Sequence, residues 1–98
     1  MAENISVRNL TSLPNIGEVL AEKLLKVGIF TKQDLIETGT KNVMLKIVRL
    51  EDSGVCLNMM YALEGAIQGI RWHGLNKERK EELKDFFNKT LKGKIIIK

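Results

Sequence analysis

The sequence predicts an all-α protein, a compact bundle of five or six short helices. Apolar residues recur at the three-to-four-residue spacing of an amphipathic helix in several segments. Gly, Pro, Ser and Thr separate these segments at intervals typical of short helices. The single β-prone run, Lys94-Ile95-Ile96-Ile97-Lys98, has no second strand to join.

The length of 98 residues suits one domain. We expect an ordered core over about residues 5–91 and a basic tail over residues 92–98. A chain of this size buries roughly 60–70% of its unfolded surface, which suffices for one core without metals or disulfides. The single cysteine, Cys56, excludes an intrachain disulfide. Residues 1–10 are polar and no apolar run reaches the ~18 residues of a membrane span, so we expect a cytoplasmic protein.

The N-terminal part of the chain predicts a short helix followed by a turn. The helix is expected over residues 4–10, with Ser6 as its N-cap. Pro14 is excluded from a helix interior, and Gly17 offers a positive φ or a close backbone approach. The run Leu13-Pro14-Asn15-Ile16-Gly17 is therefore a turn.

Two helices joined by a tight turn are expected next. The first covers about residues 17–27, where the apolar spacing is helical, and Gly28 ends it. Thr31 is a suitable N-cap for a second helix over about residues 32–37. Asp34 then occupies the position of the capping-box Glu or Gln.

Two further amphipathic helices follow. Thr40 can cap a helix over about residues 41–50, and Asn76 can cap the last helix, over about residues 77–91. The acids and bases of the last helix alternate at i,i+4 spacing, which indicates a solvated face.

The strongest helical pattern covers about residues 55–70. Apolar and small residues fill most of its circumference, which predicts the central, buried helix. Its polar strip contains only Tyr61, Glu64 and Gln68. An interior Gly costs about 1 kcal/mol relative to Ala, so Gly65 and Gly69 predict a close approach. Another helix of the chain is the favoured neighbour, and a second copy is the alternative.

The net charge of +4 is concentrated at the C-terminus. The last ten residues contain four lysines and no acid, so basic and acidic residues balance over residues 1–88. A basic-patch argument for nucleic-acid binding therefore applies to the tail and not to the body.

The pattern from Leu10 to Leu35 resembles the helix-hairpin-helix motif, whose usual core is Leu-Pro-Gly-Ile-Gly. Here Asn15 stands in place of the first Gly, and Glu18 opens the following helix. The resemblance implies that backbone N–H groups of the hairpin hold a DNA phosphate; the alternative is a hairpin used only for packing. The candidate phosphate- or DNA-binding residues are Asn15, Ile16, Gly17, Lys23, Lys26, Lys92, Lys94 and Lys98.

A closer resemblance covers about residues 7–87. The hairpin pattern, followed by Tyr61-Ala62-Leu63-Glu64-Gly65-Ala66-Ile67-Gln68-Gly69-Ile70-Arg71-Trp72, is similar to the C-terminal domain of TfoX-type proteins. The resemblance implies a small SAM-like helical domain with helix-hairpin-helix character and an association with the regulation of DNA-uptake competence. In full-length members this domain follows a separate α/β domain, which we do not expect in these 98 residues.

No catalytic, metal-binding or cofactor-binding constellation is predicted. His73 is the single histidine, and Cys56, at the start of the central helix, is expected to be a small buried hydrophobe. One His and one Cys fall short of a metal site, and we expect the acids to lie on solvated helix faces. Trp72 is expected to fill the corner of a helical core; the alternative is that it stacks on a base.

The sequence therefore predicts a non-catalytic regulatory module with weak, sequence-independent DNA binding. The alternative is a protein-interaction or dimerisation module without nucleic-acid binding. The expected partner is accordingly DNA or a regulatory protein, and the expected state a monomer or a homodimer. The candidate interaction face contains Gly65, Gly69, Trp72, Ile95, Ile96 and Ile97.

Overall fold

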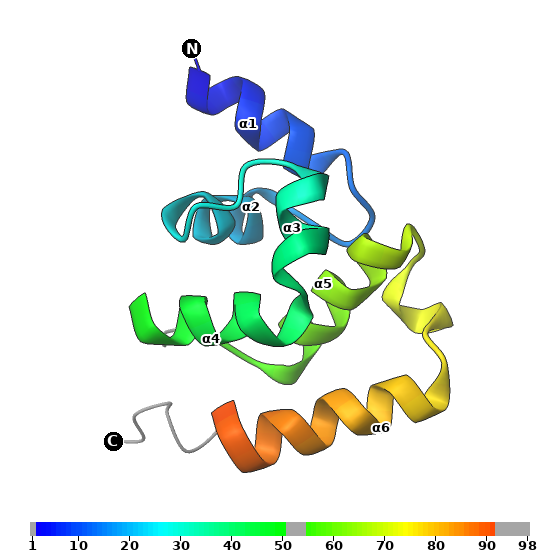
Figure 1. Ribbon diagram of the computed structural model, residues 1–98. Coiled ribbons are helices and arrows are strands. Elements are labelled where there is room, and N and C mark those ends of the chain that lie inside the picture. The colour runs from blue at the N-terminus through cyan, green and yellow to red at the C-terminus, as the bar shows by residue number, and fades with distance from the viewer. Residues whose placement is uncertain (1, 51–54, 92–98) are drawn as a thin grey trace.

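The computed structural model describes residues 2–50 and 55–91, and every regular element in these ranges is helical (Figure 1). The elements are α1 (Ala2–Thr11), α2 (Glu18–Lys26), α3 (Lys32–Thr38), α4 (Thr40–Leu50), α5 (Leu57–Gln68), the 3₁₀ turn η1 (Trp72–Gly74), α6 (Lys77–Phe86) and the π-helical segment η2 (Phe87–Leu91). The predicted all-α class is confirmed. None of the helices so described is long and apolar enough to cross a membrane.

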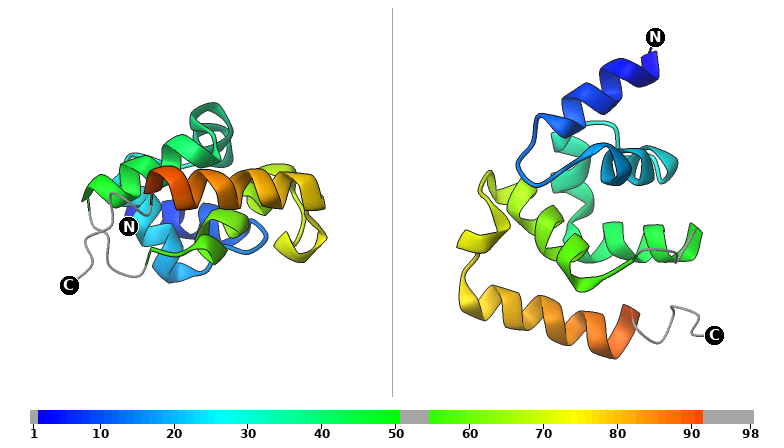
Figure 2. Two further views of the ribbon diagram at one scale, coloured as in Figure 1. Left: turned by 90° about the horizontal axis from the view of Figure 1, so that it is seen from below. Right: turned by 180° about the vertical axis from the view of Figure 1, so that it is seen from behind.

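The central helix is α5, as the sequence predicts. It contacts α3, α4, η1 and α6, while α1 packs on α2 at one end of the bundle. Figure 1 and the right view of Figure 2 show α6 along the edge opposite α1. Every helix from α2 to α6 contributes fully buried side chains to one shared core. The largest of these belong to Leu24, Leu35, Met44, Ile47, Met60, Leu63 and Leu83, with Leu10 from α1 and Leu91 from η2.

Several helix ends lie where local signals predict them. The Oγ1 of Thr31 accepts the N–H of Asp34 at 3.0 Å, and the Oδ1 of Asn76 accepts the N–H of Glu78 at 2.8 Å. Gly28, after α2, has a φ of +85° that L side chains rarely adopt. These residues act on backbone groups at the helix ends that have no partner within the helix. Because each acts over a few residues, the local sequence pattern was enough to predict these ends.

Other ends differ from the prediction. Helix α1 begins before Ser6, which therefore is not an N-cap. Thr40 lies within α4, and its buried hydroxyl donates to Glu64 instead of capping the helix. Helix α5 ends at Gln68, because Gly69 adopts a left-handed φ of +79° as its C-cap. Cys56 is exposed at the N-cap of α5, so its predicted burial is wrong.

The last predicted helix is divided. Regular α-helix ends at Phe86 and a π-helical segment continues to Leu91, whose side chain is fully buried. The predicted basic tail, with Lys92, Lys94, Lys98 and the Ile95–Ile97 run, lies outside the described residues.

Candidate functional site

The hairpin between α1 and α2 is built around Asn15. Its φ is +71°, the one positive φ of a non-Gly residue in residues 2–50 and 55–91. Asn tolerates this left-handed conformation better than most residues. Gly17 is extended, with φ −94° and ψ −177°, and a Cβ there would meet nothing within 4 Å. Neither the positive φ nor the close approach considered for Gly17 is present, and the positive φ of the hairpin occurs at Asn15.

The side chain of Asn15 ties the hairpin to the C-terminal end of α5. Its Nδ2 donates to the carbonyl oxygen of Ile70 at 2.9 Å and, more weakly, to that of Ala62 at 3.4 Å. Its Oδ1 accepts the N–H of Trp72 at 3.1 Å. We call these three bonds the Asn15 clamp. They join segments about 50 residues apart in the sequence. Asn15, the residue that departs from the usual motif, therefore holds the hairpin against the C-terminal part of α5 and the segment that follows it.

The clamp explains Gly65. A Cβ at this position would lie 2.5 Å from Asn15 Nδ2 and 2.7 Å from the carbonyl oxygen of Ile70, closer than atoms can approach. The close approach predicted at Gly65 is therefore present, but it comes from the hairpin side chain and the chain after α5 rather than from another helix. Gly65 is buried, whereas Gly69 is exposed and ends the helix.

A shallow depression of about 550 Å³ opens beside the clamp. It lies between the first turns of α2 and α5 and the Arg71–Trp72 segment. Its lining consists of Asn15, Gly17, Glu18, Val19, Leu20, Cys56, Asn58, Met59, Ala62, Arg71 and Trp72. We call this depression the hairpin groove. Val19 is 71% exposed, more than any other large apolar side chain of the described residues.

The charges around the hairpin groove come from Arg71, Glu18 and the N-termini of α2 and α5. Arg71 is exposed, and no ion pair or hydrogen bond joins its guanidinium to the described residues. The N-caps Gly17 and Cys56 provide no side-chain hydrogen bond to the first turns of α2 and α5, and the first turn of α5 contains no acid. Helix N-termini carry partial positive charge. Glu18 is the single acid in the groove lining.

Trp72 is held in a stack of rings. Its ring centroid lies 4.0 Å from that of His73 and 5.8 Å from that of Tyr61, with nearly parallel planes. The Nζ of Lys80 lies 5.3 Å from the Trp72 centroid and 5.9 Å from the Tyr61 centroid. The half-buried indole thus joins α5, η1 and α6, as expected of a corner residue.

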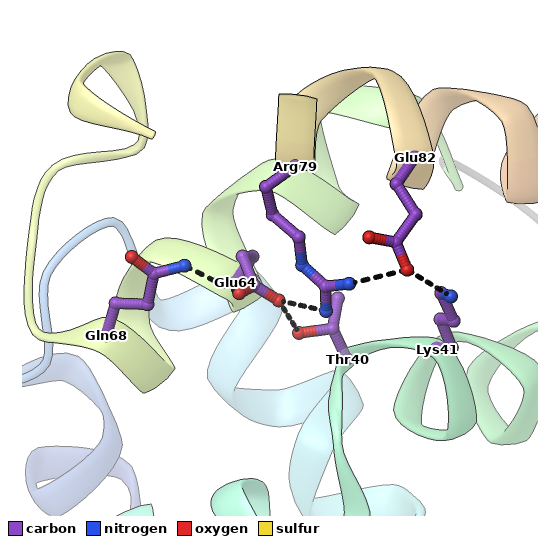
Figure 3. Close-up of polar contacts among 6 residues, drawn as sticks. All are labelled: Thr40, Lys41, Glu64, Gln68, Arg79 and Glu82. Carbon is purple, nitrogen blue, oxygen red and sulfur yellow. Dashed lines mark hydrogen bonds and ion pairs between the residues drawn. The ribbon is translucent and has the colours of Figure 1, made fainter. Parts of the chain in front are cut away.

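A second polar cluster joins α4, α5 and α6 (Figure 3). Glu64, only 6% exposed, accepts hydrogen bonds from Thr40 Oγ1 at 2.7 Å, Gln68 Nε2 at 2.7 Å and Arg79 Nη2 at 2.9 Å. Glu82 pairs with Arg79 at 3.0 Å and Lys41 at 2.8 Å. The expectation that all acids lie on solvated faces is therefore wrong for Glu64.

The pKa of Glu64 follows from these contacts. Burial alone raises the pKa of the carboxyl, but hydrogen bonds from Arg79, Gln68 and Thr40 outweigh it and hold the pKa below its ordinary value. The hydrogen bond between Arg79 and Glu64 also raises the pKa of Arg79. A carboxylate that is ionised and accepts three hydrogen bonds is well suited to connecting helices and poorly suited to general-base work.

The predicted site residues are dispersed. Asn15, Gly17 and Trp72 line the hairpin groove, while the side chain of Ile16 is buried in the core. Lys23 and Lys26 are in the last turn of α2. Lys26 lines a separate depression of about 310 Å³, together with Val27, Lys46, Arg49 and Leu50.

Sequence reasoning did not single out Val19, Met59 or Arg71, although all three line the groove. These residues come from three distant segments, so no local pattern brings them together. No group of three His, Cys, Asp or Glu side chains that could hold a metal ion is found among the described residues.

One comparison with known proteins identifies a family, and two solved structures of unassigned function are similar to the chain. The sequence profile described as the TfoX C-terminal domain matches residues 6–87. The triclinic crystal form of an uncharacterized protein from Listeria monocytogenes is similar to the chain, with a TM-score of 0.80 and 50% identity over 87% of this chain and 94% of that one. A tetragonal form of a protein of unknown function from Listeria monocytogenes has a TM-score of 0.78 and 52% identity over 82% and 96%. No curated protein matches the chain.

Proposed function

Because the chain belongs to the TfoX C-terminal domain family, a regulatory-type family, we propose that it is a non-catalytic regulatory module that binds another macromolecule through the hairpin groove. The family relationship supports the regulation of DNA-uptake competence as the process it serves. The observation that carries the proposal is the groove itself, which the exposed Val19 and the exposed Arg71 both line. Exposed apolar side chains rimmed by polar ones are typical of binding surfaces.

A protein is the favoured partner. The groove lining is largely apolar, and its described residues offer one base, Arg71, and one acid, Glu18, rather than a row of cations for phosphates. Of the hairpin backbone N–H groups expected to hold phosphate, that of Ile16 donates to the carbonyl oxygen of Leu13 at 3.4 Å. These features suit a protein surface better than a DNA backbone.

The matching experiment is affinity capture by the full chain, with and without nuclease treatment. We expect a protein partner that survives nuclease and is lost with Val19→Glu. Leu50→Glu is the matched control, because Leu50 is 56% exposed outside the groove. A partner lost with nuclease, or captured equally by Val19→Glu, would contradict a protein-binding groove.

DNA is the second candidate, favoured by the net charge of +4 and the positive ends of α2 and α5 beside Arg71. The expected binding is weak and independent of sequence. Four lysines in the last ten residues can neutralise at most about four phosphates, which gives a log–log salt slope no steeper than about −3.6 for duplex DNA. Replacing Lys92, Lys94 and Lys98 with Gln should flatten this slope. No binding at low salt would remove DNA as a partner.

A further inference from the structure

We infer that the hairpin groove binds a short apolar segment of a partner protein in which an acidic residue faces Arg71. The inference rests on the proposed interaction function and specifies the ligand of the same site. It follows from the shape, the apolar lining and the charge of the groove.

The shape and lining favour an extended apolar segment. A volume of about 550 Å³ is enough for a few side chains, and the depression is shallow and open rather than enclosed. Val19 and Leu20 come from one helix and Met59 and Ala62 from another, so apolar atoms lie on two sides. Met59 is a flexible thioether that adapts to different apolar partners.

The guanidinium of Arg71, the one basic group of the lining, selects an acidic residue in that segment. The guanidinium of Arg71 presents a planar fork that matches a carboxylate bidentately. Within the described chain no carboxylate pairs with it, whereas Arg79, the arginine of the buried cluster, has both Glu64 and Glu82. The first turn of α5, with no acid of its own, adds positive potential to the groove, whose one acid, Glu18, lies in the first turn of α2.

The test begins with peptides displayed on phage and selected against the immobilised full chain. Enriched peptides should combine apolar residues with Asp or Glu. A synthetic labelled copy should then bind by fluorescence anisotropy and change the emission of Trp72, the single tryptophan, which lines the groove. Val19→Glu and Arg71→Glu should each weaken binding at least about tenfold. Arg49→Glu, on the exposed end of α4 outside the groove, should change it by less than about twofold.

A charge exchange makes the test specific. Replacing the acid of the peptide with Lys should weaken binding to the wild type and restore binding to Arg71→Glu. Enriched peptides without acids, or a failure of this exchange, would overturn the role of Arg71. Peptides that bind Val19→Glu as tightly as wild type would leave an interaction function elsewhere on the chain and overturn the groove as its site. Duplex DNA binding that weakens with Arg71→Glu, without any enriched peptide, would make the groove a nucleic-acid surface and overturn the inference.

Discussion

The substitution Gly65→Ala should destabilise the protein, although it improves helix propensity. The new Cβ would fall 2.5 Å from Asn15 Nδ2 and 2.7 Å from the carbonyl oxygen of Ile70. The second contact is with backbone, which cannot move aside as a flexible side chain can. The hairpin and the Ile70–Trp72 segment must therefore shift, and the Asn15 clamp must weaken or break.

The magnitude follows from three contributions. Ala in place of Gly stabilises a helix by about 1 kcal/mol. Each hydrogen bond of the clamp contributes about 0.5–1.5 kcal/mol, and overpacking costs about 1–3 kcal/mol. With partial relaxation, the free energy of unfolding should fall by about 1–4 kcal/mol. For a domain of this size each kcal/mol lowers the melting temperature by about 4–8 °C.

Urea denaturation followed by circular dichroism and by Trp72 fluorescence measures this change. Gly17→Ala is the matched control, because Gly17 is extended and a Cβ there meets nothing within 4 Å. The free energy of unfolding of Gly17→Ala should lie within about 0.5 kcal/mol of the wild-type value or slightly above it. Asn15→Gly keeps the positive φ and removes the amide, so it should cost about 1–3 kcal/mol through the lost hydrogen bonds alone.

The reasoning is refuted if Gly65→Ala is as stable as wild type. It is also refuted if Gly65→Ala and Asn15→Gly destabilise additively. Because both changes act on the same clamp, the double variant should be less destabilised than the sum of the single variants.

Three further predictions follow from the polar contacts and the composition. Glu64 has a lowered pKa, so its stabilising contribution is complete above its ordinary pKa of 4.5 and is lost as the pH falls through the lower folded value. The variant Glu64→Gln should therefore have a lower melting temperature than wild type at pH 7. It should also lose less stability than wild type between pH 5 and pH 2. An equal loss in both proteins would assign the acid sensitivity to other groups. Thr31→Ala removes the cap of α3 and should cost about 1 kcal/mol in urea titrations, whereas an unchanged midpoint would show that the cap contributes nothing. Treatment with EDTA should leave the circular dichroism spectrum unchanged, and a large loss of helix would reveal a structural metal.

Most of the fold was predictable because its signals are local. The cap at Thr31, the cap at Asn76 and the stop at Gly28 each act within four residues, and the apolar spacing of α5 marks it as the central helix. Burial of Glu64 was not predictable in the same way. A carboxylate in a helical pattern predicts an exposed side chain unless its partner is known. Here the partner, Arg79, lies 15 residues away.

The candidate site depends on contacts of long sequence separation. From the sequence, Asn15 is only a departure from the usual motif, because the partners of its side-chain amide lie 47 to 57 residues later. Gly65 correctly predicted a close approach, because a Gly inside a helix has a helix-propensity cost that close packing can offset. No local pattern, however, could identify the atoms that approach it. That Arg71 and Val19 line one groove likewise follows only from the packing of α5 against the hairpin.

Site-specific photo-crosslinking tests the hairpin groove as a binding surface most directly. A benzophenone amino acid replaces Val19 in one full-length variant and Leu50, outside the groove, in another. After irradiation in cells and nuclease treatment, the variant at position 19 should form a discrete protein adduct, and an additional Arg71→Glu substitution should diminish that adduct. The variant at position 50 should form none. An adduct at position 50 but not at position 19, or an adduct that nuclease removes, would contradict a protein-binding groove.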